Sequence, residues 1–302
     1  PSTLLEHYQS LFLKAQKIKL KPKIIITSRK HWTNVIFKFW LALMQQKGTK
    51  VLCACHGGGY GLKMEAMNFE DDISDIKINW YKPYHPKHIQ MPALNLRKFK
   101  RNLNTKYIML IGFENPIYPR RIESTPVSGQ TLYLLDHVDT IFANLNKELK
   151  DKFVIRPYTD QGWGIKNALK KKYGSDKLVL GDNYNKYLKN SKIVICTYPE
   201  TSFCEGMFSG PTIIVYDPNL WEINENFDKL HNLMLEAKIM FFDPLLAVNH
   251  INNIFDKVDD WWQSDKVINA RKLFAEYVSH APEDSFKKWR KFVKHEKSFI
   301  KI

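Results

Sequence analysis

Short apolar segments rich in β-branched residues alternate along this chain with segments of helical periodicity. The first part predicts helices over residues 4–18 and 34–46, a strand over 23–27, and a second strand over Val51 to Cys55. Gly48 fits the C-terminal stop of the second helix. This alternation is typical of an α/β fold in which helices flank a parallel sheet.

A second alternation begins at residue 107, after a polar stretch over residues 63–104 that three prolines interrupt. It predicts strands at 107–112, 153–158, 178–180, 192–197 and 212–216, with helices at 132–149, 165–173, 184–190 and 202–208. Such a series predicts a Rossmann-like domain. Helices over 247–262, 266–279 and 285–297 close the chain, and we expect the last to pack back on the first domain. We therefore predict two domains that face a cleft, residues 1–104 and 105–302.

The net charge of the chain favours anionic partners. The chain of 302 residues has 46 basic and 31 acidic residues, a net charge of +15. This favours nucleic acid, an anionic membrane surface or a phosphorylated substrate. Nucleic acid is disfavoured because zinc-finger spacing, an RNP signature and a basic coiled coil are all missing from the sequence. The basic cluster of residues 287–297, interleaved with Phe286, Trp289 and Phe292, predicts peripheral binding to an anionic membrane.

Cysteine usage and hydropathy indicate a cytoplasmic protein. The four cysteines have neither the pattern of a disulfide framework nor the spacing of a zinc site. No run approaches the roughly 18 apolar residues of a membrane span, and the first residues do not resemble a signal peptide.

A glycine-rich loop follows the strand that ends at Cys55. His56 is followed by Gly57, Gly58, Gly59, Tyr60 and Gly61. Glycine lets the backbone approach a ligand closely, so these amides can cradle a phosphate or another oxyanion. The spacing matches neither the dinucleotide fingerprint nor a nucleoside-triphosphate loop. A tight turn that needs glycine only for its geometry is the alternative.

Polar residues also follow two strands of the second domain, where ligands bind in open α/β sheets. Arg156 can hold a phosphate or a carboxylate, or it can pair with Asp160, and Tyr158 and Trp163 share its loop. Further along, Thr201 or Ser202 can cap the next helix, whose amides then point at an anion. Glu205 is within reach of a ribose diol, or serves only the helix dipole.

Taken together and in order, these motifs resemble the O-antigen transferases of bacterial surface-polysaccharide loci. The similarity covers about residues 50 to 295 and rests on the strings HGGGYG (56–61), EDDISD (70–75), RPY (156–158), GWG (162–164), PETS (199–202) with Glu205, PT (211–212), DPNLWE (217–222) and WW (261–262). It implies a GT-B glycosyltransferase with two facing Rossmann-like domains, a donor nucleotide held by the C-terminal one, and no essential metal or other cofactor. Members are longer at the N-terminus, so the first domain is expected to be short or incomplete. Kinship with transferases of CMP-activated ulosonic acids such as Kdo is also implied.

The function predicted on this basis is transfer of a sugar from a nucleotide-activated donor to a growing surface polysaccharide or lipopolysaccharide, as in O-antigen or capsule. The donor is a CMP-ulosonate or an NDP-hexose, the acceptor a glycan or glycolipid, and the location the cytoplasm, peripheral at the inner face of the cytoplasmic membrane. A non-catalytic subunit that binds sugar nucleotides or polysaccharide is the alternative, followed by a basic nucleic-acid-binding protein.

Sugar transfer requires a base for the acceptor hydroxyl and groups that stabilise the leaving phosphate. His56 is the candidate base, because its ordinary pKa suits that task. Four carboxylates compete with it: Glu65, Glu70, Asp71 and Asp72. The residues expected to bind the donor are Gly57, Gly58, Gly59, Tyr60, Arg156, Tyr158, Trp163, Glu200, Thr201, Ser202 and Glu205.

Overall fold

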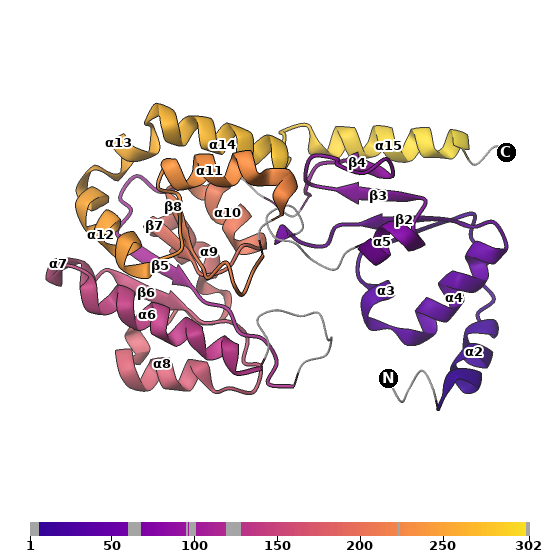
Figure 1. The fold of residues 1–302 in the computed structure, drawn as a ribbon, viewed down its shortest axis with the longest axis horizontal. Helices are drawn as coiled ribbons and strands as arrows, with labels where there is room; N and C mark the ends of the chain where they lie inside the picture. The colour runs from indigo at the N-terminus through magenta and orange to yellow at the C-terminus, as the bar shows by residue number, and fades with distance from the viewer. Residues whose placement is uncertain are drawn as a thin grey trace. The chain divides into compact units, whose positions relative to one another are not determined.

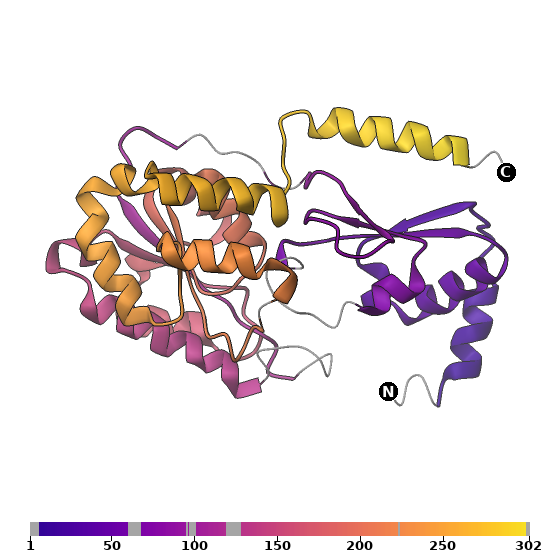
Figure 2. The same ribbon diagram turned by 45° about the horizontal axis from the view of Figure 1, so that its top comes forward.

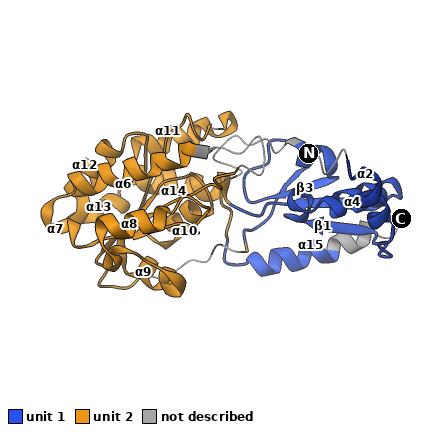
Figure 3. Cartoon of the chain, turned by 90° about the horizontal axis from the view of Figure 1, so that it is seen from below, with its two compact units in different colours: residues 1–57, 66–93, 282–302 blue, residues 58–65, 94–281 orange. Residues whose placement is uncertain are grey.

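A computed structural model describes residues 6–59, 68–94, 96, 101–118, 128–222 and 224–299. The chain forms two compact units (Figure 3). Unit 1 comprises residues 1–57, 66–93 and 282–302, and unit 2 comprises residues 58–65 and 94–281. A single boundary at residue 104 does not describe this division, because the chain passes between the units four times. The C-terminal segment belongs with unit 1, since its apolar side chains pack there.

Unit 1 contains a four-stranded parallel sheet in the order β1-β2-β3-β4 (Figure 1). Its strands are β1 (Ile24–Thr27), β2 (Lys50–Ala54), β3 (Ile76–Asn79) and β4 (His88–Gln90), and its helices are α2 (Tyr8–Gln16), α3 (Lys30–Thr33), α4 (Val35–Gln46), α5 (Asn68–Ile73) and α15 (Ser285–Phe299). The expectation of an irregular segment over residues 63–104 was therefore wrong for its central part. Helix α5 and the short strands β3 and β4 lie there. Their sequence is polar because some of their charged side chains form ion pairs inside the unit, so it does not show the apolar pattern of buried elements.

Both faces of this sheet are covered. Because successive side chains of a strand point to opposite faces, strand β2 contributes to the core on each side. On one face, Val51 and Cys53 pack with Trp40 and neighbouring residues of α4. On the other, α15 runs along the sheet (Figures 1 and 2), and its Trp289 and Phe292 join the cluster around Leu52. Helix α15 thus completes the core of unit 1.

Unit 2 contains a five-stranded parallel sheet in the order β6-β5-β7-β8-β9. The strands are β5 (Tyr107–Ile111), β6 (Phe153–Arg156), β7 (Ser191–Cys196), β8 (Thr212–Val215) and β9 (Met240–Phe241). The helices are α6 (Tyr133–Asn144), α7 (Lys147–Lys150), α8 (Ile165–Tyr173), α9 (Tyr184–Asn190), α10 (Thr201–Ser209), α11 (Asp228–Glu236), α12 (Pro244–Ile254), α13 (Val258–Trp262) and α14 (Asp265–Tyr277). The expected strand over 178–180 is only an isolated bridge between Ile155 and Leu178.

Helices cover both faces of the second sheet (Figures 1 and 2). Side chains of α6, α8 and α12 form the larger core with alternate residues of the strands, Ile108 and Leu110 among them. On the other face, Phe203 of α10 packs edge-on against Phe274 of α14, with ring centroids 5.3 Å apart. Trp262 is buried, and Trp261 donates a hydrogen bond to the carbonyl of Ala237, 3.0 Å away. Both tryptophans therefore belong to the packing of unit 2.

The strand order places a topological switch point between β5 and β7. From β5 the chain runs to β6 on one side of it, then crosses back to β7 on the other. In open α/β sheets, ligands bind beyond the carboxyl ends of strands at such a point. The residues that follow β5 and β7 are therefore the ones to inspect.

Candidate functional site

Helix α10 begins directly beyond the carboxyl end of β7. The hydroxyl of Thr197 donates to the carbonyl of Ile111 at the end of β5, 2.9 Å away, and so ties the two strand ends together. The N-cap residue is Glu200, whose side chain makes no capping bond. The prediction that Thr201 or Ser202 caps this helix was wrong, since Thr201 is its first residue and the Ser202 hydroxyl pairs with Tyr198, 2.9 Å away. The amides of Phe203 and Cys204 donate to the Glu200 carbonyl, 3.0 and 3.3 Å away. Helix geometry leaves the amides of Thr201 and Ser202 without an intrahelical acceptor, so these two can bind an anion.

Glu205 lies one turn into α10 and is held in place by a tyrosine. The hydroxyl of Tyr184 donates to Oε2 of Glu205, 2.9 Å away. Burial raises the pKa of Glu205, and the Tyr184 hydrogen bond opposes that rise. Burial also raises the pKa of Tyr184, as does the neighbouring Glu205 charge, so the phenol stays a donor. The carboxylate has a fixed position beside the start of the helix.

Arg156, at the end of β6, fixes the segment that leads to α9. Its Nη1 donates to the carbonyls of Val179 and Gly181, each 3.0 Å away. The guanidinium carbon also lies 5.7 Å from the ring centroid of Tyr184. The alternative partner, Asp160, instead accepts a hydrogen bond from the amide of Gly162, 2.9 Å away. Arg156 thus supports the wall of the site on the Glu205 side.

Glu114 was not identified from the sequence, although it follows β5 at the switch point. Only 2% of its surface is exposed, and it accepts hydrogen bonds from the amides of Gln161 (2.9 Å) and Trp163 (3.3 Å). Burial raises the pKa of Glu114. The Trp163 indole donates to the carbonyl of Asn115, 3.0 Å away. Glu114 and Trp163 therefore hold the loop after β6 against the loop after β5. The sequence signal for Glu114 is its place shortly after β5, which has no distinctive spacing.

Tyr158 belongs to an aromatic group at the same strand ends. Its ring centroid lies 5.5 Å from that of Phe113 and 6.4 Å from that of Tyr198. Tyr158 remains 40% exposed, whereas Tyr198 is buried. This partly exposed ring lies at the edge where ligands bind in open α/β sheets.

The glycine-rich loop meets the start of α10 at Gly58. The Gly58 amide donates to Oγ1 of Thr201, 3.0 Å away, and the Gly58 carbonyl accepts from Sγ of Cys204 at 3.8 Å. A Cβ atom at Gly58 would lie 2.4 Å from that sulfur. Glycine is required here by close contact with protein, and the Gly58 amide already has an acceptor. Gly59 is buried and Gly57 half-buried; Tyr60 lies outside the described residues.

The candidate bases that the structure describes belong to unit 1. His56 is exposed and follows β2, whereas Glu65 lies outside the described residues. Glu70 has no exposed surface, and its Oε1 lies 2.7 Å from Nε2 of His31 and accepts from the indole of Trp32 at 2.6 Å. Lys77, also fully buried, places its Nζ 3.6 Å from the other Glu70 oxygen.

Asp71 extends the same network, and Asp72 is exposed. Oδ1 of Asp71 lies 2.8 Å from Nε2 of His88 and 3.3 Å from Nζ of Lys77. Asp71, His85 and His88 also bring possible metal-ligand atoms within 4.8 Å of one another. The Lys77 ammonium supplies a positive charge at that place, which opposes a cation. The assignments of a base to His56 or to one of the four carboxylates remain predictions.

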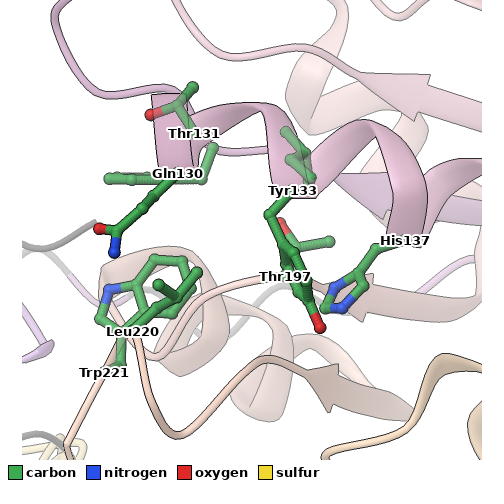
Figure 4. Close-up of a pocket in the computed structure, with 9 residues that line it drawn as sticks. Gln130, Thr131, Tyr133, His137, Thr197, Leu220 and Trp221 are labelled. Carbon is green, nitrogen blue, oxygen red and sulfur yellow. The ribbon is translucent and has the colours of Figure 1, made fainter. Parts of the chain in front are cut away.

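A pocket opens beside Thr197 on the other side of the switch point (Figure 4). Phe113, Leu134, Leu220 and Trp221 supply much of its wall. Its polar members include His137, which is 4% exposed and lies beside the ring of Tyr133, with centroids 4.5 Å apart. Burial lowers the pKa of His137, so the imidazole is neutral at pH 7.

Two parallel sheets with helices on both faces, and a helix start at the switch point, define an α/β protein of GT-B type. The chain belongs to the LIC12162 family of transferases, whose family model matches residues 1–293. It is therefore a transferase with a GT-B fold. No curated protein sequence matches it.

Solved structures share this fold at low sequence identity. The UDP complex of MnaA from S. aureus is 12% identical, with a TM-score of 0.54 over 99% of this chain and 82% of that chain. A protein from Listeria monocytogenes assigned as a UDP-N-acetylglucosamine 2-epimerase is 9% identical, with a TM-score of 0.57 over 98% and 81%. A variant of the wall teichoic acid polymerase TagF soaked with CDPG is 12% identical, with a TM-score of 0.52 over 100% and 96%. Among the described helices, none combines the length and apolarity needed to cross a bilayer.

Proposed function

We propose that the protein is a glycosyltransferase that binds a nucleotide-activated sugar at the switch point of unit 2 and transfers the sugar to a glycan or glycolipid. One observation carries the proposal. The N-cap residue of α10, Glu200, makes no side-chain capping bond, and Glu205, held by Tyr184, stands one turn further along the same helix. An anion site beside a fixed carboxylate suits a nucleotide, which has a phosphate and a ribose diol.

The spacing along α10 fits this ligand. Thr201 and Glu205 are four residues apart, which corresponds to about 6 Å along a helix axis. The donor phosphates bind the first-turn amides of Thr201 and Ser202, and the ribose hydroxyls donate to Glu205. The nucleobase then lies toward the segment that Arg156 holds through the carbonyls of Val179 and Gly181. The UDP complex of MnaA and the CDPG-soaked TagF variant have the same fold and are consistent with a nucleotide ligand.

The reaction forms one bond and breaks one. The acceptor hydroxyl oxygen attacks the anomeric carbon of the sugar, and the bond from that carbon to the phosphate oxygen breaks. The electron pair stays on the phosphate, where the α10 amides and Arg156 oppose the developing charge. The hydroxyl proton passes to the base, for which His56 is our candidate. In this scheme backbone amides and Arg156 take the role that a metal ion has in other transferases.

We also propose that unit 1 binds an anionic membrane, the inner face of the cytoplasmic membrane, through α15. Trp289 and Phe292 face the sheet, and Lys287, Arg290, Lys291 and Lys294 lie on the exposed side of the helix. Phe286 is 78% exposed at the border of that basic side. A basic helix face with an apolar edge binds in the interface of anionic lipids. The acceptor is then a lipid-linked glycan of the lipopolysaccharide or surface-polysaccharide type.

The donor assignment is tested by thermal shift with free CMP, UDP, GDP and ADP, since a ligand of the native state raises the melting temperature. We expect one of them to stabilise the protein by several degrees, and an activated sugar of that nucleotide to be slowly hydrolysed without acceptor. If none shifts the melting temperature, the proposal is wrong. Binding without any turnover would instead support a non-catalytic subunit.

Membrane binding is tested with liposomes. Vesicles that contain anionic phosphatidylglycerol should retain the protein at low salt, and zwitterionic vesicles should not. A Phe286→Ala variant should be retained less, because the apolar anchor is shortened, while its melting temperature stays unchanged. Equal retention on both kinds of vesicle would contradict the proposal.

A further inference from the structure

Tyr158 is the exposed member of an aromatic group at the switch point of unit 2. Its ring centroid lies 5.5 Å from that of Phe113, and the Phe113 ring lies 4.8 Å from Tyr198 and 5.6 Å from Trp221. Those three rings are buried, whereas Tyr158 is 40% exposed. A ring that rests on buried aromatic side chains is already held in place, so a ligand that contacts it loses little conformational entropy.

A hydrogen bond links this aromatic group to the start of α10. The hydroxyl oxygens of Tyr198 and Ser202 lie 2.9 Å apart. Ser202 belongs to the first turn of α10, where the proposed function places the donor phosphates. The ring centroids of Tyr158 and Tyr198 are 6.4 Å apart. Tyr158 is therefore connected to the phosphate position through a single intervening side chain.

Tyr158 and Arg156, two residues apart in the chain, contact different parts of the site. Arg156 lies against Tyr184, the residue that holds Glu205, on the side where the proposed function places the ribose and the nucleobase. Tyr158 instead packs toward the ends of β5 and β7, through the rings described above. A donor with its phosphates at α10 and its ribose at Glu205 therefore leaves Tyr158 for the group attached to its last phosphate.

The chemistry of a tyrosine ring favours one class of transferred group. The face of an aromatic ring is apolar and carries negative partial charge, so it attracts the polarised C–H bonds on one face of a pyranose ring. Stacking removes that apolar C–H face from water, while the hydroxyl groups at the edge of the sugar stay hydrated. An open-chain group such as glycerol has no flat C–H face to offer.

We propose that Tyr158 is the platform on which the pyranose ring of the transferred sugar stacks, and that this contact selects a cyclic sugar over an open-chain group. The inference rests on the proposed function and names the residue that recognises the donor beyond its nucleotide. The ring face makes the contact, and the phenol hydroxyl is not needed for it. Phenylalanine therefore replaces Tyr158 without loss.

Titration calorimetry with pairs of a sugar nucleotide and its free nucleotide tests this proposal. The pairs are UDP-glucose with UDP, GDP-mannose with GDP, and CMP-N-acetylneuraminate with CMP; CDP-glycerol is the open-chain probe. In the pair that binds most tightly, Tyr158→Ala should weaken the sugar nucleotide about three- to tenfold and leave the free nucleotide within about twofold. Tyr158→Phe should keep both affinities, and neither variant should change the affinity for CDP-glycerol.

Two further variants separate recognition from folding. Tyr158→Leu keeps apolar bulk against Phe113 but has no aromatic face, so it should lose sugar affinity as Tyr158→Ala does. Tyr84→Ala in unit 1 is the matched control, because Tyr84 is 43% exposed and also packs on aromatic rings. It should leave every affinity unchanged, and melting temperatures show that each variant is folded.

The other outcomes each overturn the inference. Equal losses for the sugar nucleotide and its free nucleotide would place the ring at the nucleotide. Equal losses in Tyr158→Phe and Tyr158→Ala would assign the contact to the hydroxyl, and no loss in either would show that Tyr158 does not touch the donor. Tightest binding of CDP-glycerol would also contradict a platform for a cyclic sugar. Wild-type protein that binds none of the nucleotides would instead refute the proposed function.

Discussion

Replacement of Glu205 tests the nucleotide site most directly. A hydrogen bond between a charged group and a hydroxyl contributes about 1.5–3 kcal/mol, so Glu205→Ala should weaken binding of the preferred nucleotide about 10- to 150-fold. The loss affects ground and transition states alike, so KM should rise while kcat changes little. Titration calorimetry on the folded variant measures the nucleotide affinity, and steady-state rates measure KM and kcat.

A deoxynucleotide shows whether the ribose itself is the contact. Wild-type protein should bind the 2′- or 3′-deoxy form of its nucleotide less tightly than the ribonucleotide, and Glu205→Ala should bind the two forms almost equally. This double-mutant cycle measures the Glu205–hydroxyl interaction separately from any change in folding. Tyr184→Phe keeps the carboxylate but removes the donor that positions it, and should cost about fivefold. If Glu205→Ala still distinguishes the deoxynucleotide as the wild type does, the ribose assignment is wrong.

The stability of the Glu205 variants also has a defined dependence on pH. Burial raises the native pKa of Glu205 above its ordinary value, so the native state binds this proton more tightly than the unfolded state does. This group therefore favours folding at low pH, and its contribution declines as pH rises from the unfolded to the native pKa. Glu205→Gln should remove that decline. Thermal unfolding of both proteins between pH 4 and pH 7 measures the difference, which should grow with pH.

Three further substitutions test other parts of the structure. His56→Asn should lower kcat about 10²- to 10⁴-fold and leave nucleotide affinity within a few-fold, whereas near-native kcat would exclude His56 as the base. Glu70→Gln should lower the free energy of unfolding by about 3–5 kcal/mol, because it leaves Lys77 buried without its full countercharge. An unchanged midpoint of urea denaturation would contradict this. Gly58→Ala should cost about 1–3 kcal/mol, and Cys204→Gly in the same chain should recover part of it in thermal unfolding.

The sequence predicted the second sheet well because its strands are long, apolar and separated by amphipathic helices. Ile193 to Ile195 reads as a buried strand in any α/β arrangement, and the residues after it had to lie at the carboxyl edge. The first sheet was harder to predict. Lys77 stands in the middle of β3 and is fully buried, so the strand does not read as an apolar run. Only the pairing with Glu70, from another element, makes that position compatible with a core.

Side-chain positions were predictable only where the end of a strand or the start of a helix decides them. The place of Glu205 follows from the helix start after β7, but nothing local shows that Tyr184 donates to it. Glu114 was missed because a single acidic residue after a strand has no distinctive spacing. Its two amide donors come from a loop more than forty residues away.

Gly58 shows why a glycine-rich loop is ambiguous in a sequence. Glycine is needed wherever a Cβ atom would collide, and the colliding atom can belong to a ligand or to the protein. At Gly58 that atom is the sulfur of Cys204, and the amide that was expected to bind phosphate donates to Thr201 instead. That hydrogen bond ties the glycine-rich loop to the first residue of α10. In the proposed function the glycine therefore contributes to the anion site indirectly, through its contact with the start of α10.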